Sequence, residues 1–450
     1  MKKIFNIFKD KKIHKVYITL AITLGTIFSL FMPFFNEPDG QYHLAVSGMV
    51  TDSIIDASQY NEYKVDSGMT RQSEFYKNGT RLETYYFNRG GFVEKEKVPR
   101  NIRLSYLDFT FWGHLVPGIG LFLGKHIYPS MGVMITTARF LSTIINSTII
   151  YFVIKKVKKG KLLFCLVFLS PVVINSFASL SYDSTGFVAV GLFLMLVINT
   201  VVDGRISSDK RVQFLLSTLL ILLGAKWNYW LFILFWPVLE FTYTDCFKNI
   251  RLKVSDKMNV NSWSKKNKII AIILGSFITF SMLIILTRNH GGIFRVLQRY
   301  LMTFGYNYSG SELLSNDISS WLVAPYPSQN YMPIWITAVW YLFFFLVLFM
   351  EQKFVKRKAI GLLSFLFFIV GVLGVYYTML SYNDARTSYI EGVQGRYFTP
   401  TLLLLQITAS SIKPRLNRYS RQIVPVLLFF LIIVTNLLLI FDTTVGLIMR

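Results

Sequence analysis

Two carboxylates and a histidine lie in the stretch NEPDGQYH, which follows the first long apolar run of the chain. They are Glu37, Asp39 and His43. A carboxylate at the mouth of a membrane helix can take the proton of an acceptor hydroxyl that attacks a lipid-borne sugar. The same spacing also fits a helix cap, with Asn36 or Asp39 capping a helix that starts near Gln41. The residues alone leave both interpretations open.

A second candidate is Asp183 in the stretch SLSYDSTG, between two apolar blocks. Its carboxylate could bind a sugar hydroxyl or hold a phosphate through a cation. Taken alone, the position favours a helix N-cap for a segment that begins at Ser184.

Several cations could stabilise a lipid-phosphate leaving group, which needs positive charge as its negative charge develops. Lys226 lies in AKWNYW beside three aromatic residues, and Arg295 and Arg299 are four residues apart, so they would share one helix face. Anchoring at the membrane interface is the alternative role for such side chains. Lys226 fits that alternative least well, because it separates two closely spaced apolar blocks.

The stretch QGRYFTP, residues 394–400, precedes an apolar segment near the end of the chain. Gln394, Arg396 and Tyr397 offer amide, guanidinium and phenol groups that could grip a phosphate or a sugar. Gly395 permits a close approach of the backbone. Each of these residues, taken singly, could instead cap the helix or anchor it at the membrane interface.

The elements that must position these residues are membrane helices. Of the 450 residues, 53% are hydrophobic and 16% aromatic, and the apolar residues form blocks long enough to cross a bilayer. The formal charge of +23 comes from basic clusters between those blocks, which indicates membrane orientation rather than nucleic-acid binding. Two cysteines are too few for a disulfide framework or a cysteine metal site.

Apolar segments follow one another along the whole chain. They lie at 16–35, 106–124, 131–154, 162–179, 184–202, 212–225, 228–243, 268–287, 332–350, 359–380, 397–412 and 423–441. If the segment at 106–124 spanned, the basic run at 155–161 would face outside and every later loop would invert. Asp108 in that segment would also cost about 3 kcal/mol at the bilayer centre. We therefore expect it to lie at the interface or re-enter.

The prediction is a single all-α polytopic membrane domain, residues 1–441, with eleven spanning helices. Its basic N-terminus, 1–15, faces the cytoplasm, and 442–450 is a short outward C-terminus. The first outward loop, 36–130, is large and holds juxtamembrane or re-entrant helices, and further outward loops lie at 288–332 and 381–396. The cytoplasmic loops lack a phosphate-binding glycine motif and metal-ligand spacing, so no cofactor and no divalent cation is indicated.

In order along the chain, PDGQYH, SYDS, AKWNYW and GVQGRYFTP resemble the bacterial membrane family called domain of unknown function 2142, over roughly residues 30–410. GVQGRYFTP is the most specific part of this resemblance. The family is similar in architecture to the GT-C glycosyltransferases, which take a sugar from a polyprenyl-phosphate carrier on the outer face. The resemblance implies a GT-C-like bundle with an acidic base in the first outward loop, and Asp39 falls on that position.

One residue departs from the family pattern. Where the family has Pro-Asp-Glu-x-x-His, this chain has Gly40 in place of the Glu. Glu37 could supply the second acid, or the site could use Asp39 alone. The departure puts in doubt any mechanism or metal site that needs two adjacent acids.

The expected function is a bacterial, multi-pass membrane glycosyltransferase whose active site faces outside. Its partners would be a polyprenyl-phosphate sugar, a cell-surface or lipid-linked glycan acceptor and the bilayer. Asp39 would be the base, Arg396 and a loop arginine would stabilise the phosphate, His43 or Asp183 would position substrate, and inversion is expected. A lipid-linked glycan flippase or transporter, or a polysaccharide polymerase or ligase using a pyrophosphate carrier, are the alternatives.

Overall fold

The structure is an all-helical arrangement in the part of the chain it covers. The computed structural model describes residues 12–35, 37, 39–57, 82–98, 102–247, 264–305, 318–326, 330, 332–351, 353–382, 384, 387–412, 416 and 418–446. In these residues the β pairing is limited to one bridge between Ile55 and Phe92. The described helices that are long and apolar enough to cross a membrane number six: Ile13–Phe31, Met131–Lys156, Asp183–Asp203, Lys265–His290, Lys358–Ser381 and Arg421–Thr444. The chain is thus a helical membrane protein with several candidate spans.

A broken helix lies at the centre of the bundle. The block at 162–179, expected as one helix, is two short helices, α8 (Lys161–Phe168) and α9 (Pro171–Phe177). Ser170 caps α9 through the Val173 N–H, and Pro171 occupies the first turn, where a missing N–H costs nothing. Both helices are almost wholly buried. Around them pack α2 (Ile13–Phe31), α7 (Met131–Lys156), α17 (Ile334–Leu348) and α20 (Arg418–Phe441).

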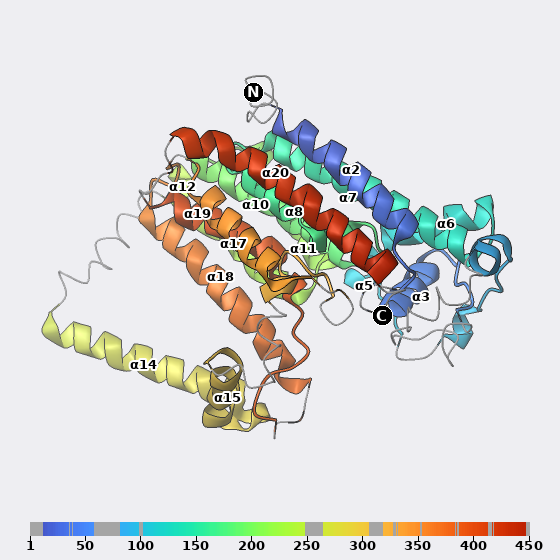
Figure 1. Ribbon diagram of the computed structural model, residues 1–450. Coiled ribbons are helices and arrows are strands. Elements are labelled where there is room, and N and C mark those ends of the chain that lie inside the picture. Colours follow the sequence, from blue (N-terminus) through green and yellow to red (C-terminus); the bar gives the residue numbers. More distant parts are fainter. Residues whose placement is uncertain are drawn as a thin grey trace.

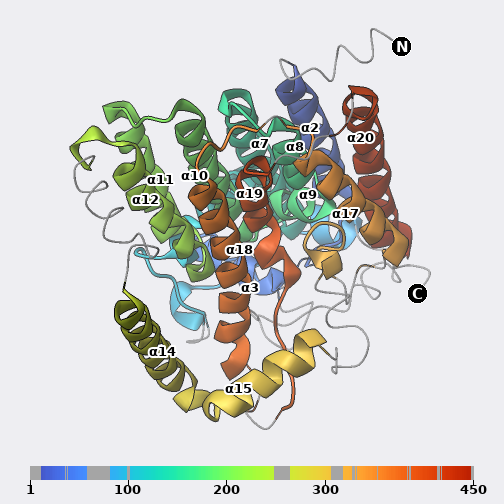
Figure 2. The same ribbon diagram turned by 90° about the vertical axis from the view of Figure 1, so that its left-hand side faces the viewer.

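Helix α10 (Asp183–Asp203) connects the two ends of the bundle. Its length corresponds to about 30 Å, the thickness of a hydrocarbon core. At its last residue, Asp203 pairs with Lys158 after α7 and with Lys210 of α11 (Ser208–Gly224). The connections α7–α8 and α10–α11 lie at the upper end of Figure 2, whereas α3 and α15 lie toward the lower end.

Two further apolar blocks begin as 3₁₀ helices. The block at 228–243 forms η4 (Trp227–Leu234) followed by α12 (Phe235–Tyr243). The block at 397–412 forms η10 (Gly395–Leu403), which contains Pro400, and then α19 (Leu404–Ser410). Both pack against α18 (Lys358–Thr378). Their 3₁₀ starts bring Lys226 and Arg396 to the same end of the bundle as Asp183.

The segment between α2 and α7 contains short helices. They are α3 (Gly40–Val50), η2 (Leu82–Phe87), η3 (Lys95–Lys97), α5 (Phe109–Trp112) and α6 (Leu115–Ile127). Helix α6 packs along the start of α7, where Gly120 and Gly124 approach the α7 backbone. With 13 residues, α6 falls short of the roughly 20 needed to span. The block at 106–124 is therefore two short helices.

Helix α14 (Lys265–Thr287) stands apart from the bundle in Figure 1. The following helix α15 (Gly292–Tyr300) packs through Val296 on the end of α18 and on Ile390. Arg299 strengthens that attachment, because its guanidinium donates to the carbonyls of Leu380 and Tyr389. This contact tethers α14 to the rest of the molecule.

Candidate functional site

Asp39 occupies a strained turn immediately before α3. Its backbone is left-handed, with φ of 57°, a conformation that costs a non-glycine residue roughly 1–2 kcal/mol. The side chain makes no capping hydrogen bond to α3, and it is half-buried. The capping interpretation therefore does not describe Asp39. Strain of this kind gathers at functional sites, where surrounding structure maintains it.

Glu37 is held by an ion pair with Arg139 of α7. The Arg139 Nη2 lies 3.2 Å from Glu37 Oε2 and also donates to the Pro33 carbonyl, and Nη1 donates to the Met32 carbonyl. Arg139 is 0% exposed and Glu37 is 4% exposed. Since Met32 ends α2, the guanidinium satisfies carbonyls that the helix leaves unpaired. Glu37 thus completes a structural contact beside the Asp39 turn.

Gly40 is enclosed in this turn. A Cβ at position 40 would lie 2.7 Å from the Phe35 Cα and 3.3 Å from the Glu37 carboxyl carbon. An acidic side chain at position 40 would have to displace backbone. The turn therefore has no room for a second acid at position 40.

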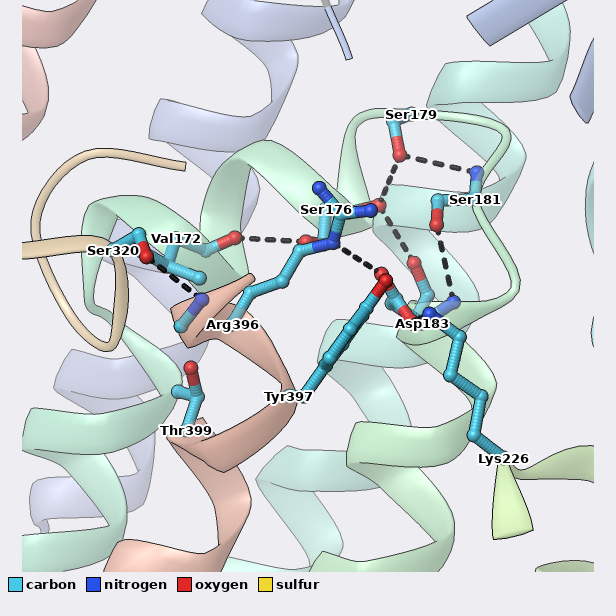
Figure 3. A network of polar contacts seen from close by, with 12 residues as sticks. Val172, Ser176, Ser179, Ser181, Asp183, Lys226, Ser320, Arg396, Tyr397 and Thr399 are labelled. Atoms are coloured by element: carbon cyan, nitrogen blue, oxygen red, sulfur yellow. Dashed lines mark hydrogen bonds and ion pairs between the residues drawn. The ribbon is translucent and has the colours of Figure 1, made fainter. Parts of the chain in front are cut away.

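Asp183 forms the centre of a buried ionic cluster, hereafter the Asp183 cluster, made of Asp183, Lys226 and Arg396 (Figure 3). Arg396 Nε donates to Asp183 Oδ2 at 2.6 Å, and Lys226 Nζ lies 3.3 Å from Oδ1. Asp183 is the first residue of α10 rather than its cap, and its own N–H donates to the Ser181 hydroxyl. The cap predicted for Asp183 is therefore wrong, and its carboxylate instead gathers two cations from distant segments.

The cations of this cluster keep unused hydrogen-bond donors. Lys226 Nζ is buried with no hydrogen-bond partner, and lies 3.7 Å from the Tyr397 ring centroid and 4.6 Å from that of Tyr182. No described residue accepts a bond from the Nη groups of Arg396. Gln394 Oε1 is likewise buried without a partner. The cluster has two cations and one carboxylate, and it therefore has a net positive charge. Together with the unused donors, this charge suits an anionic ligand.

Asp39 lies within electrostatic range of this cluster. Its charge acts on Arg396, more weakly than that of Asp183 does, and on the Tyr42 phenol in the first turn of α3. A half-exposed carboxylate is thus near a buried cationic group that comes from a segment more than three hundred residues away in sequence.

His43 is hydrogen-bonded to His114, a residue that the motifs did not single out. His43 Nδ1 and His114 Nε2 are 2.9 Å apart, and His114 Nδ1 is 2.7 Å from the Thr110 carbonyl. The ring of Tyr182 lies between this pair and Lys226. Burial lowers the pKa of His43 well below its usual value and lowers that of His114 to about 4, so both rings are neutral at pH 7.

Arg295 and Arg299 do share α15, as their spacing predicted. Arg299 is buried against the carbonyls of Leu380 and Tyr389, and Arg295 donates to Gln298. Asp183 has Lys226 and Arg396 as its ionic partners, so neither of these arginines joins the Asp183 cluster. Their positions fit attachment of α15 better than phosphate binding.

The sequence signals missed His114, Tyr182 and Arg139. A buried arginine inside an apolar block requires a partner, and that rule alone could have pointed Arg139 to Glu37. His114 also lies in an apolar block, where it would be costly against lipid, but its contact with His43 depends on the fold. No group of three or more His, Cys, Asp or Glu side chains suited to a metal occurs among the described residues.

These features define a helical membrane protein with an ionic site at one end of its bundle. The chain belongs to the family of predicted membrane proteins designated DUF2142, whose family model matches residues 22–405. The match covers all the residues of the ionic site, so the family resemblance drawn from the four motifs is confirmed. No similar curated protein and no similar solved structure was found.

Proposed function

We propose that the protein is a membrane glycosyltransferase that moves a sugar from a polyprenyl-phosphate donor to a cell-surface or lipid-linked glycan. The observation that carries this proposal is the position of Asp39. Its half-exposed carboxylate makes no capping hydrogen bond to α3 and lies within electrostatic range of the cationic Asp183 cluster. Transfer of this kind needs a base for the acceptor hydroxyl and positive charge for the departing phosphate at one place. The site offers both, and the GT-C architecture is proposed with it.

In the proposed step, the acceptor oxygen attacks the anomeric carbon while its proton passes to the Asp39 carboxylate. The bond between that carbon and the phosphate oxygen breaks, and the electron pair leaves with the polyprenyl phosphate. Attack from the opposite face inverts the anomeric centre. Arg396 and Lys226 stabilise the growing negative charge, and Tyr397 and Gln394 complete the phosphate side.

Asp183 has a supporting role in this mechanism. It neutralises one of the two cations, which makes their burial tolerable, since an unpaired buried charge is costly. One positive charge remains for the phosphate. Glu37 is not required as a second acid, because its carboxylate is engaged by Arg139.

We propose the eleven-pass topology with the ionic site outside. The basic residues Lys158 and Lys210 gather at the Asp203 end of α10, and the positive-inside rule assigns such an end to the cytoplasm. Asp183 begins the same helix, so the site then faces outward. A reporter fused after Arg450 should be active only outside; activity only in the cytoplasm would overturn this topology.

A transporter would carry charges along a path through the bilayer. The two charged residues inside apolar blocks that could mark such a path are both paired: Arg139 with Glu37, and Glu240 with Arg211. Their pairing favours the enzyme over a flippase.

Substitution of the proposed base tests the function. Asp39→Asn should lower sugar transfer by about 10²–10⁴-fold, because it removes the proton acceptor. Asp52→Asn is the matched control, since Asp52 is an exposed aspartate of the same outward segment with the same left-handed backbone, φ 52°. Transfer is measured as incorporation of labelled sugar into membrane and wall glycans. Full activity of an Asp39→Asn protein that reaches the membrane would refute the proposal.

A further inference from the structure

The His43–His114 pair has a defined direction of hydrogen bonding. The Thr110 carbonyl can only accept a hydrogen bond, so the His114 Nδ1 at 2.7 Å must carry a proton. His114 is neutral, and its Nε2 is therefore an acceptor. The His43 Nδ1, 2.9 Å away, must then be the donor. The chain of bonds runs from His43 through His114 to a backbone carbonyl.

This direction fixes the free nitrogen of His43. With its proton on Nδ1, neutral His43 has a bare lone pair on Nε2. That nitrogen is buried and has no hydrogen-bond partner among the described residues. The charged groups that act on His43 are Asp183, Arg396 and Lys226, so the ring borders the Asp183 cluster. An unpaired acceptor in such a place costs free energy unless a donor arrives.

The group that pairs with His43 Nε2 must carry a hydrogen that it can donate. A phosphate oxygen would be repelled by a lone pair, and it is better served by Lys226 and Arg396. A hydroxyl group can donate to Nε2 and still keep its oxygen for other contacts. The site therefore has two chemically distinct sides, a cationic one and a basic, uncharged one.

We propose that His114 locks His43 in the Nδ1-protonated tautomer so that His43 Nε2 accepts a hydrogen bond from a carbohydrate hydroxyl. The choice of a carbohydrate rests on the proposed function. His43 is thus a substrate-binding residue on the sugar side of the site, and His114 is a positioning residue that acts through it. The Thr110 carbonyl, by accepting from His114 Nδ1, sets the tautomer of both histidines.

Nitrogen NMR of histidine tests the tautomer directly. The full-length protein is labelled with ¹⁵N-histidine, placed in lipid bilayers at pH 7.5, and the His43 signals are assigned by their loss in His43→Ala. The expected result is a protonated Nδ1 and an unprotonated Nε2. A protonated Nε2 on His43 would overturn the proposal, whatever the activity of the protein.

A substitution then tests the lock. In His114→Ala, His43 should gain a substantial population protonated on Nε2. The control is His126→Ala, because His126 also lies at α6 and bonds a carbonyl of its own helix through Nδ1, but is exposed. An unchanged His43 spectrum in His114→Ala would show that His114 does not set the tautomer.

Kinetics separate this inference from the proposed function. His114→Ala should raise the acceptor or donor KM by about 2- to 10-fold, as expected for one lost hydrogen bond, with a smaller change in kcat. His114→Gln should recover part of the loss, because its side-chain oxygen can accept from His43 Nδ1. Wild-type protein with the expected tautomer but no transferase activity would refute the glycosyltransferase and leave the histidine assignment standing. Active protein with unchanged KM in His114→Ala would refute the positioning role alone.

Discussion

The molecule has two buried ionic groups near the turn that carries Asp39, and their cations are used differently. Arg139 donates to two carbonyls at the end of α2 and to Glu37. Arg396 gives its Nε to Asp183, and no described residue accepts from its Nη groups. Lys226 adds a second positive charge beside the same carboxylate.

This difference separates a structural contact from a binding site. The Arg139 pair is balanced in charge, and its two terminal nitrogens donate to the Met32 and Pro33 carbonyls and to Glu37, whereas its Nε is buried without a hydrogen-bond partner among the described residues. The Asp183 cluster carries a surplus positive charge, because two cations lie beside one carboxylate. Both groups are buried and each contains a nitrogen without a hydrogen-bond partner in the described part of the chain, so neither property by itself indicates function; the surplus positive charge of the Asp183 cluster does.

The comparison predicts the largest loss of stability at Arg139. Arg139→Ala leaves Glu37 buried without its counter-charge and removes three hydrogen bonds, so unfolding free energy should fall by about 3–5 kcal/mol. Thermal unfolding in detergent measures the change. Arg205→Ala, at an exposed arginine in the α10–α11 connection, is the control. If the two variants had the same melting temperature, the Glu37–Arg139 pair would not stabilise the fold as proposed.

The histidine pair predicts a loss of stability in acid. The pKa of His114 is lowered by burial to about 4 from the usual 6.5, so between these values the unfolded chain binds a proton that the folded chain does not. Stability from this residue is therefore complete above pH 6.5 and decreases as the pH falls, by about 3 kcal/mol at pH 4. His114→Gln should reduce this acid loss, whereas His126→Gln should not. Identical pH profiles for wild type and His114→Gln would contradict this account.

Hydropathy predicted the apolar blocks well, because helices in a membrane must satisfy their backbone internally. It did not predict the break between α8 and α9, although Ser170 and Pro171 form a cap and a first-turn proline that the sequence displays. The 3₁₀ starts at Trp227 and Gly395 were also missed. The α8–α9 break and the segment at Gly395 are buried inside the bundle, and the segment at Trp227 packs against α18 while part of it is exposed, so packing rather than propensity decides the backbone there.

Within the site, the sequence selected Asp39, Asp183, Lys226 and Arg396, and the structure brings them to one end of the bundle. The sequence did not indicate which side chain each of these groups would pair with. Asp183 looked like a helix cap and Glu37 like a second acid until their cations were located. His114 is 71 residues from His43, and nothing in their spacing indicates a contact.

Lys226 tests the surplus charge of the Asp183 cluster. Lys226→Met keeps a chain of similar length and leaves the Asp183–Arg396 bond in place, so unfolding free energy should fall by less than the about 3–5 kcal/mol expected when a buried charge loses its partner altogether. Transfer should fall by about 100-fold, as for loss of one group that stabilises developing charge. Initial rates and melting temperatures are compared in one preparation. A variant that unfolds as readily as Arg139→Ala would make Lys226 structural and would erase the distinction between the two ionic groups.

A substitution of Gly40 tests the turn that carries Asp39, and its expected effect is the smallest. Gly40→Ala places a Cβ 2.7 Å from the Phe35 Cα, so the turn must shift, at a cost of about 1–2 kcal/mol of stability. Gly374→Ala is the control, because a Cβ there meets nothing within 4 Å. Gly40→Glu, which restores the acid of the family pattern, should be at least as destabilised and should not gain activity, since Glu37 and Phe35 occupy its space. Wild-type stability with raised transfer in Gly40→Glu would mean that the turn accommodates a second acid, and Asp39 would then share its role as base.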